Sequence, residues 1–106
     1  MSDQVRASHI LLMYEGSMRS TATRSQDEAE TLINDLKTQI DDGANFAGLA
    51  KEHSDCPSGS EGGDLGHFSK GMMVPEFDQV AFDIEPGQNS DVVKTDFGYH
   101  LIQRTE

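Results

Sequence analysis

The sequence has little that would anchor it in a membrane or cross-link it. Its 106 residues include a single cysteine, Cys56, so no disulfide can form within the chain. No apolar stretch approaches the roughly 20 residues that a transmembrane helix needs. The polar start MSDQVRAS also lacks the apolar region of a signal peptide. A chain of this length can bury enough apolar surface to fold without metal or disulfides. We therefore expect one cytoplasmic domain spanning residues 1–106, with no membrane partner.

Basic residues are scarce as well. Lys and Arg number 8 against 19 Asp and Glu, which gives a net charge of −11. Such a charge repels phosphate backbones and anionic lipid headgroups, so we expect no nucleic-acid partner. Ten of the acidic residues lie between residues 25 and 64, largely on one expected helix. This placement is typical of a solvated helix face rather than of an acidic recognition surface.

The first part of the chain predicts a strand, a loop and a long helix. Residues 5–14 (VRASHILLMY) form a short apolar segment typical of a buried strand, and the polar residues 15–24 should form a loop. Ser25 and Glu28 make a capping box that begins a helix, which Gly43 should end. The apolar positions of this helix recur on one side: Ala29, Leu32, Ile33, Leu36 and Ile40.

The middle of the chain predicts a second helix and an irregular stretch. Asn45 can cap a shorter helix that stops near Ser54. Its apolar side consists of Phe46, Leu49, Ala50 and His53. Residues 57–71 hold five of the ten glycines, so we expect a loop around a very short strand at residues 65–68.

The last part predicts a third helix and a hairpin. Pro75 suits the first turn of a helix that residues 86–87 (Pro-Gly) terminate. Residues 90–105 read as two strands joined by a turn at residues 96–98. Strands at both ends with helices between them predict an α+β domain with a mainly antiparallel sheet.

Four polar residues could carry chemistry: His9, Cys56, Thr95 and His100. The terminal strands of a small α+β fold commonly meet in the sheet centre, which would bring His9 and His100 together in a dry setting. Two such imidazoles cannot both be charged cheaply, so we expect neutral rings that share a hydrogen bond. Thr95 would fix the rings, with Cys56 as a further candidate partner. The alternative is that each histidine is an ordinary core residue.

Other chemistries have weaker support. Cys56 with a histidine base would suit a thiol hydrolase, but no signature of such a family surrounds it. The histidines and Cys56 show no pair at the spacing of a zinc site, so we expect no metal. The run GSEGGDLG lacks the G-K-[ST] ending of a phosphate loop.

Five separated motifs together resemble the parvulin family of peptidyl-prolyl cis/trans isomerases: SHILL, SDCPSG, GGDLGHF, GMMVPEFDQVAF and TDFGYHLIQR. The resemblance covers residues 6–106 in order and spacing. It implies a four-stranded, mainly antiparallel sheet flanked by about four helices, and an enzyme that rotates X-Pro bonds without a cofactor. It identifies His9 and His100 with the paired histidines of the family, Cys56 with its active-site cysteine and Thr95 with its threonine. It also implies a set of substrate-binding residues: Leu65, Met73, Phe77, Phe97 and Phe68.

The sequence departs from the phosphate-directed branch of the family. That branch has a lysine four residues after the first histidine, where this chain has Met13, and two arginines in the following loop. Here the loop offers Met18 and Arg19, so Arg19 is the candidate anion contact. A phosphate clamp normally needs several converging positive groups. We therefore expect no phosphate requirement before proline. The chain also contains no tryptophan, and hence no WW domain of the kind that accompanies some relatives.

The expected partners are proline-containing peptides and unfolded or flexible protein segments, bound by a monomer. Two alternatives stay open: a non-catalytic peptide-binding or chaperone module that uses the same apolar pocket, and an isomerase directed to phosphoserine or phosphothreonine before proline.

Overall fold

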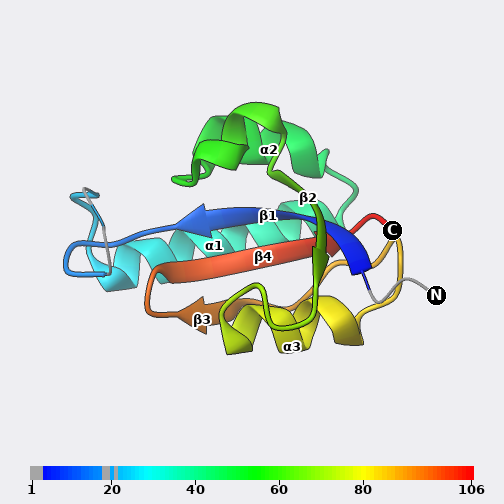
Figure 1. Ribbon diagram of the computed structural model, residues 1–106. Coiled ribbons are helices and arrows are strands. Elements are labelled where there is room, and N and C mark those ends of the chain that lie inside the picture. Colours follow the sequence, from blue (N-terminus) through cyan, green and yellow to red (C-terminus); the bar gives the residue numbers. More distant parts are fainter. Residues whose placement is uncertain (1–3, 18–19, 21) are drawn as a thin grey trace.

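The computed structural model describes residues 4–17, 20 and 22–106. These residues form a four-stranded antiparallel sheet of order β2-β1-β4-β3 with three α-helices and one 3₁₀ helix (Figure 1). The strands are β1 (Gln4–Leu12), β2 (Asp64–Ser69), β3 (Val93–Thr95) and β4 (Gly98–Arg104). The helices are α1 (Gln26–Asp41), α2 (Phe46–His53), the 3₁₀ helix η1 (Pro57–Glu61) and α3 (Pro75–Asp83). The predicted α+β class and antiparallel sheet are confirmed. In the described part of the chain, no helix combines the length and apolar character needed to cross a membrane.

The two terminal strands lie side by side in the middle of the sheet, as the sequence predicts. β1 pairs along residues 7–12 with β4, while β2 and β3 form the two edges. Because side chains alternate along a strand, each central strand contributes to both faces. On β1, Ile10 and Leu12 face one core cluster and Val5 and Ala7 face the other.

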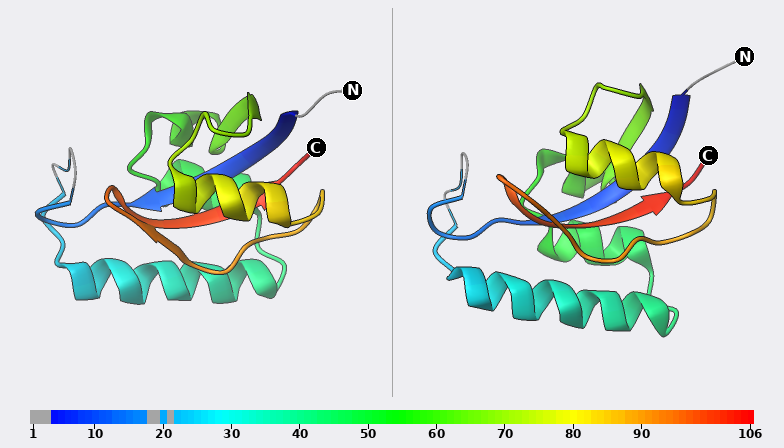
Figure 2. Two further views of the ribbon diagram at one scale, coloured as in Figure 1. Left: turned by 60° about the horizontal axis from the view of Figure 1, so that its bottom comes forward. Right: turned by 90° about the horizontal axis from the view of Figure 1, so that it is seen from below.

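Helices cover both faces of the sheet. α1 lies against one face and α3 against the other (Figure 2). The first face also receives α2, and its core includes Ile33 and Phe46. The second face carries Phe68 and Phe77. His9 and His100 belong to this second face, because they alternate with Ile10 and Leu101 of the first.

The helix ends follow local signals in the sequence. Ser25 and Glu28 form the predicted capping box, with the Glu28 N–H donating to Ser25 Oγ and the Ser25 N–H donating to Glu28 Oε1. Asn45 caps α2 by accepting from the Gly48 N–H at 2.7 Å. Pro75 occupies the first turn of α3. The helix-start predictions are therefore confirmed.

Three boundaries differ from the sequence prediction. β1 ends at Leu12, because the Met13 N–H donates to the Asp55 carboxylate instead of to a neighbouring strand. Residues 57–61, expected as loop, form η1, whose first turn is closed by the Gly59 N–H bonding to the Cys56 carbonyl. The hairpin strand expected from Ser90 begins as β3 only at Val93.

Candidate active site

The imidazoles of His9 and His100 meet on the α3 face of the sheet. Their Nδ1 atoms lie 3.3 Å apart, and the rings stack with centroids 5.4 Å apart. The two residues are only 6% and 4% exposed. The expected meeting of the two histidines in a dry setting is thus confirmed. It follows from their diagonal register, since His9 pairs with Ile102 and His100 with Leu11.

Thr95 anchors one end of this pair. Its Oγ1 lies 2.7 Å from His100 Nε2 and accepts a hydrogen bond from the Phe97 N–H at 3.2 Å. If the Thr95 hydroxyl donates to Nε2, the His100 proton is on Nδ1 and bonds to His9 Nδ1, leaving the His9 proton on Nε2. Within the described part of the chain, His9 Nε2 is buried without a hydrogen-bond partner. The network therefore ends at this atom.

Burial keeps both rings neutral. Loss of hydration lowers the pKa of His9 to about 4. The pKa of His100 falls to about 3, first through burial and then through repulsion by a charged His9. At neutral pH both rings can therefore serve as hydrogen-bond donors and acceptors without carrying charge.

Cys56 lies at the start of η1 and is half-buried. Its Sγ accepts a hydrogen bond from Ser58 Oγ at 3.2 Å. Among the described residues no hydrogen bond joins Cys56 to either imidazole. The structure thus corrects the expectation that Cys56 helps to fix the rings, because the tight turn of η1 places the Ser58 hydroxyl beside the sulfur. The hydrogen bond between Cys56 and a histidine base that a thiol hydrolase would use is likewise absent among the described residues.

Backbone contacts hold the segment before Cys56 against β1. The Leu11 N–H donates to Ser54 Oγ at 3.1 Å, and the Asp55 N–H donates to the Leu11 carbonyl at 2.7 Å. Nearer the start of the strand, the His9 N–H donates to the Gly63 carbonyl at 2.9 Å. His9 and the cysteine segment are therefore positioned by the same edge of β1.

An apolar group lies next to the paired imidazoles. Phe77 of α3 packs edge-on against His9 and His100, with centroid distances of 5.5 and 5.7 Å. Leu65 and Met73 are half-buried and pack in the same cluster. Phe68 is 1% exposed and contacts Phe77, so it supports the group from the core and is not an exposed wall.

Two expected contacts remain, Phe97 and Arg19. Phe97 is half-buried in the turn between β3 and β4. Arg19, the candidate anion contact, lies outside the described residues. Arg24 donates to the Met13 carbonyl at 2.9 Å and forms an ion pair with Asp55, so its charge is already engaged.

Sequence reasoning missed Ser54, Ser58 and the contact of Gly63 with His9. Ser58 lies two residues after Cys56, and Pro57 between them is a signal for a tight turn that could have brought it into consideration. The role of Ser54 carries no comparable local signal, because its partner Leu11 is 43 residues away.

Comparison with known proteins places this architecture among the parvulin-type peptidyl-prolyl cis/trans isomerases. Residues 1–106 match the family described as "PPIC-type PPIASE domain". The chain belongs to this family.

Similar proteins and structures agree with this assignment. Peptidyl-prolyl cis-trans isomerase Pin1 of Digitalis lanata is 38% identical over 115 residues, which cover 98% of both chains. Foldase protein PrsA of Geobacillus sp. (strain WCH70) is 42% identical over 104 residues, covering 97% of this chain and 32% of PrsA. Peptidyl-prolyl isomerase ESS1 from Candida albicans superposes with a TM-score of 0.91 at 35% identity, over 98% of this chain and 63% of that one. The solution structure of TbPIN1 gives 0.90 at 33% identity over the full length of both. The enzyme class expected from the motifs is thereby confirmed.

Proposed function

We propose that this chain accelerates the rotation of X-Pro bonds in peptides and in unfolded or flexible protein segments, without a phosphate requirement and without covalent chemistry. The observation that carries the proposal is the contact of Phe77 with two buried, neutral imidazoles. An apolar surface beside a small polar network is the form expected of a pocket for a proline ring and its amide.

The physical task is modest for such a site. Amide resonance raises a rotational barrier of about 18–20 kcal/mol. Accelerating the rotation by roughly 10⁴ to 10⁵ requires only about 5–7 kcal/mol of preferential binding to the twisted amide. The twisted amide has lost resonance, so a dry site that holds the ring and accommodates the turning carbonyl favours it. No proton or electron has to move, which is why we expect no cofactor.

Each group of residues then has a distinct part. The proline ring is held by Leu65, Met73 and Phe77. Phe68 packs behind Phe77, and Phe97 lies over the opening of the proline pocket. His9, Thr95 and His100 supply the polar network that meets the amide. The half-buried Cys56 thiol tunes the local field without attacking the carbonyl, because isomerisation breaks no bond.

Two phenylalanines of α3 allow a matched test of the pocket. Phe77→Ala removes the ring that touches both imidazoles, whereas Phe82→Ala removes one that packs against Phe68. In an isomerase assay on proline peptides, Phe77→Ala should lower kcat/KM by about 100-fold and Phe82→Ala by far less. Equal rates for the Phe77 variant and the wild type would remove the pocket assignment.

The role of Cys56 separates the isomerase from a thiol hydrolase. Cys56→Ser and Cys56→Ala should both retain part of the isomerase rate, because neither a nucleophile nor a thiolate is required. Complete loss in both variants, together with an acylated wild-type cysteine detected by mass spectrometry, would instead support the hydrolase.

The absence of a phosphate requirement is supported by two observations. Met13 stands where the phosphate-directed branch has a lysine, and Arg24 is engaged by Asp55 and by the Met13 carbonyl. Matched Ser-Pro, Glu-Pro and phosphoSer-Pro peptides should have similar kcat/KM values, within about threefold. A much faster reaction of the phosphorylated peptide would favour the phosphate-directed alternative.

Relatives named foldase protein PrsA and chaperone SurA support a role of this chain in protein folding. We also infer that it is a cytoplasmic monomer. Sedimentation measurements test the monomer, and cell fractionation tests the compartment. If the wild type bound proline peptides but left their isomerisation rate unchanged, the chain would be a binding module instead.

A further inference from the structure

Strand β2 departs from regular pairing where it carries Leu65. Ser8 pairs with Asp64 but Arg6 pairs with His67, so Leu65 and Gly66 together oppose a single residue of β1. Such a bulge bends the strand and redirects a side chain. Gly66 has a φ of +71°, a conformation that glycine adopts without strain.

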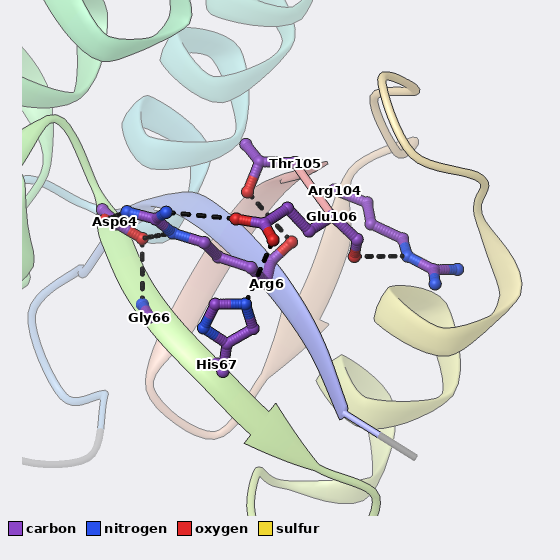
Figure 3. A network of polar contacts seen from close by, with 7 residues as sticks. All are labelled: Arg6, Asp64, Gly66, His67, Arg104, Thr105 and Glu106. Atoms are coloured by element: carbon purple, nitrogen blue, oxygen red, sulfur yellow. Dashed lines mark hydrogen bonds and ion pairs between the residues drawn. The ribbon is translucent and has the colours of Figure 1, made fainter. Parts of the chain in front are cut away.

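The Asp64 carboxylate stabilises this bulge by hydrogen bonds. Its Oδ1 accepts the Gly66 N–H at 2.9 Å, which ties the start of the bulge to its end. Arg6 donates two hydrogen bonds to the same carboxylate: Nε donates to Oδ1 at 3.2 Å, and Nη2 donates to Oδ2 (Figure 3). Paired donors of this kind fix the orientation of a carboxylate as well as its position.

The C-terminus completes the arrangement around Arg6. Arg6 Nη1 donates to Glu106 Oε2 at 3.1 Å, and the Thr105 hydroxyl donates to the Arg6 carbonyl at 3.1 Å (Figure 3). The guanidinium is therefore held between two carboxylates. The hydrogen bond from Arg6 holds the pKa of Asp64 below its usual range, so Asp64 is charged when the contact forms.

The Arg6 side chain and the apolar cluster that contains Phe77 lie on different faces of the sheet. Val5 and Ala7 belong to the cluster of Phe77, and alternation along β1 places Arg6 on the other side. Leu65, by contrast, packs in the cluster of Phe77. The Arg6 side chain is therefore linked to this cluster through Asp64 and the backbone of the bulge.

We propose that Arg6 is a positioning residue for the proline pocket: through Asp64 it holds the bulge of β2 in the shape that directs Leu65 toward Phe77. This inference rests on the proposed function, in which Leu65 and Phe77 bind the proline ring. A pocket wall contacts the ring in both the planar and the twisted states. Displacing that wall therefore weakens binding of the substrate more than it slows turnover.

The first experiment separates KM from kcat. Isomerisation rates of a proline peptide are measured by NMR exchange over a range of peptide concentrations for the wild type, Arg6→Gln and Arg6→Lys. Arg6→Gln should raise KM by about three- to tenfold and change kcat by less than about twofold. The KM of Arg6→Lys should lie between those of the wild type and Arg6→Gln, because an ammonium restores the charge but not the two parallel hydrogen bonds. The control Lys37→Gln removes surface ion pairs with Asp41 and Asp91, away from the bulge, and should change neither constant.

A double-mutant cycle with Leu65→Ala tests whether Arg6 acts through this wall. In the Leu65→Ala background, Arg6→Gln should raise KM no further, because the side chain to be positioned is gone. An equal factor in both backgrounds, or an unchanged KM with only a lower Tm, would overturn the inference. If Arg6→Gln does not fold, Arg6→Lys serves in the same cycle. A wild type without isomerase activity would remove the proposed function and this inference with it, whereas an active wild type with additive variants removes the inference alone.

Discussion

At the scale of single residues, the site is a set of polar groups that function without charge. His9 packs against both a second imidazole and the ring of Phe77, and it is 6% exposed. Water is therefore unavailable to stabilise an imidazolium. The hydrogen bond between the rings also requires that one of the two Nδ1 atoms be unprotonated. The neutrality of the pair is the property that single substitutions and pH can test.

The first prediction concerns pH and stability. The folded pKa values of His9 and His100 are about 4 and about 3, below the ordinary value of about 6.5. As pH falls below about 6.5 the unfolded chain takes up protons first, so the free energy of unfolding should be largest above that pH and decrease toward pH 4. Urea unfolding at several pH values between about 7.5 and 4.5 measures the slope.

A variant comparison assigns this slope to the buried pair. His100→Gln should flatten the decrease between about pH 6.5 and 5, where few carboxylates titrate. His53→Gln on α2, outside the pair, is the comparison variant. A slope that is the same in the wild type and in His100→Gln would contradict the assignment.

The second prediction concerns the hydroxyl of Thr95. Thr95→Val keeps the shape of the side chain but leaves His100 Nε2 buried without its partner at 2.7 Å. The expected loss is about 1–3 kcal/mol in the free energy of unfolding, with a lower isomerase rate. Thr95→Ser retains the hydroxyl and should stay close to the wild type in both measurements. Equal stability of the two variants would show that the hydrogen bond contributes little.

At the scale of elements, the edge of β1 positions the site. β2 pairs with the first half of this edge, and Ser54 and Asp55 bond to Leu11 further along it. Between them, the Gly63 carbonyl accepts the His9 N–H. The polypeptide before and after η1 is thus held against the strand that carries His9.

The third prediction concerns the close approach at Gly63. A Cβ there would collide with the backbone carbonyl of His9, and φ is +83°. Gly63→Ala should therefore displace β1 at His9, with a loss of isomerase activity beyond that caused by backbone strain. Gly87→Ala is the matched control, because its φ of +88° is similar but its Cβ would meet nothing within 4 Å.

Stability and activity together decide this test. Both variants should be less stable by about 1 kcal/mol or more from the unfavourable φ. Only Gly63→Ala should also change the NMR signals of the His9 and His100 rings. Unchanged ring signals in that variant would show that the contact does not position His9.

At the scale of the whole molecule, the acidic residues of α1 and the candidate active site are separated. The net charge is −11, and α1, which carries Asp27, Glu30 and Asp35 among its exposed residues, lies on the face of the sheet opposite α3 (Figure 2). The acidic helix is therefore remote from the imidazole pair. It acts on substrates through the long-range field of the molecule rather than by contact.

The fourth prediction concerns this field. A proline peptide flanked by lysines should react with a higher kcat/KM at low salt than at about 0.5 M salt, where the screening length falls to a few ångströms. A peptide with glutamates at the same places should show the opposite trend, and an uncharged peptide should show neither. A common salt dependence for all three would indicate an effect on the protein rather than on the encounter.

Features that depend on neighbours a few residues apart could be predicted from the amino-acid sequence. The capping box of Ser25 and Glu28, the cap at Asn45 and Pro75 at the start of α3 all involve partners within one helical turn. The meeting of the histidines was also predictable, because the motifs place His9 and His100 on the terminal strands and those strands pair in the sheet centre.

Contacts between distant parts of the chain depend on the packed fold and could not be predicted from the sequence. Arg6 and Asp64 are 58 residues apart, and Leu11 and Ser54 are 43 apart, so no local period or turn signal relates them. The bulge at Leu65 likewise depends on how β2 pairs with β1. Even at Cys56, where the partner is only two residues away, the choice of Ser58 over an imidazole follows from the 3₁₀ turn. Side-chain geometry of this kind depends on the packed backbone, which sequence spacing alone does not specify.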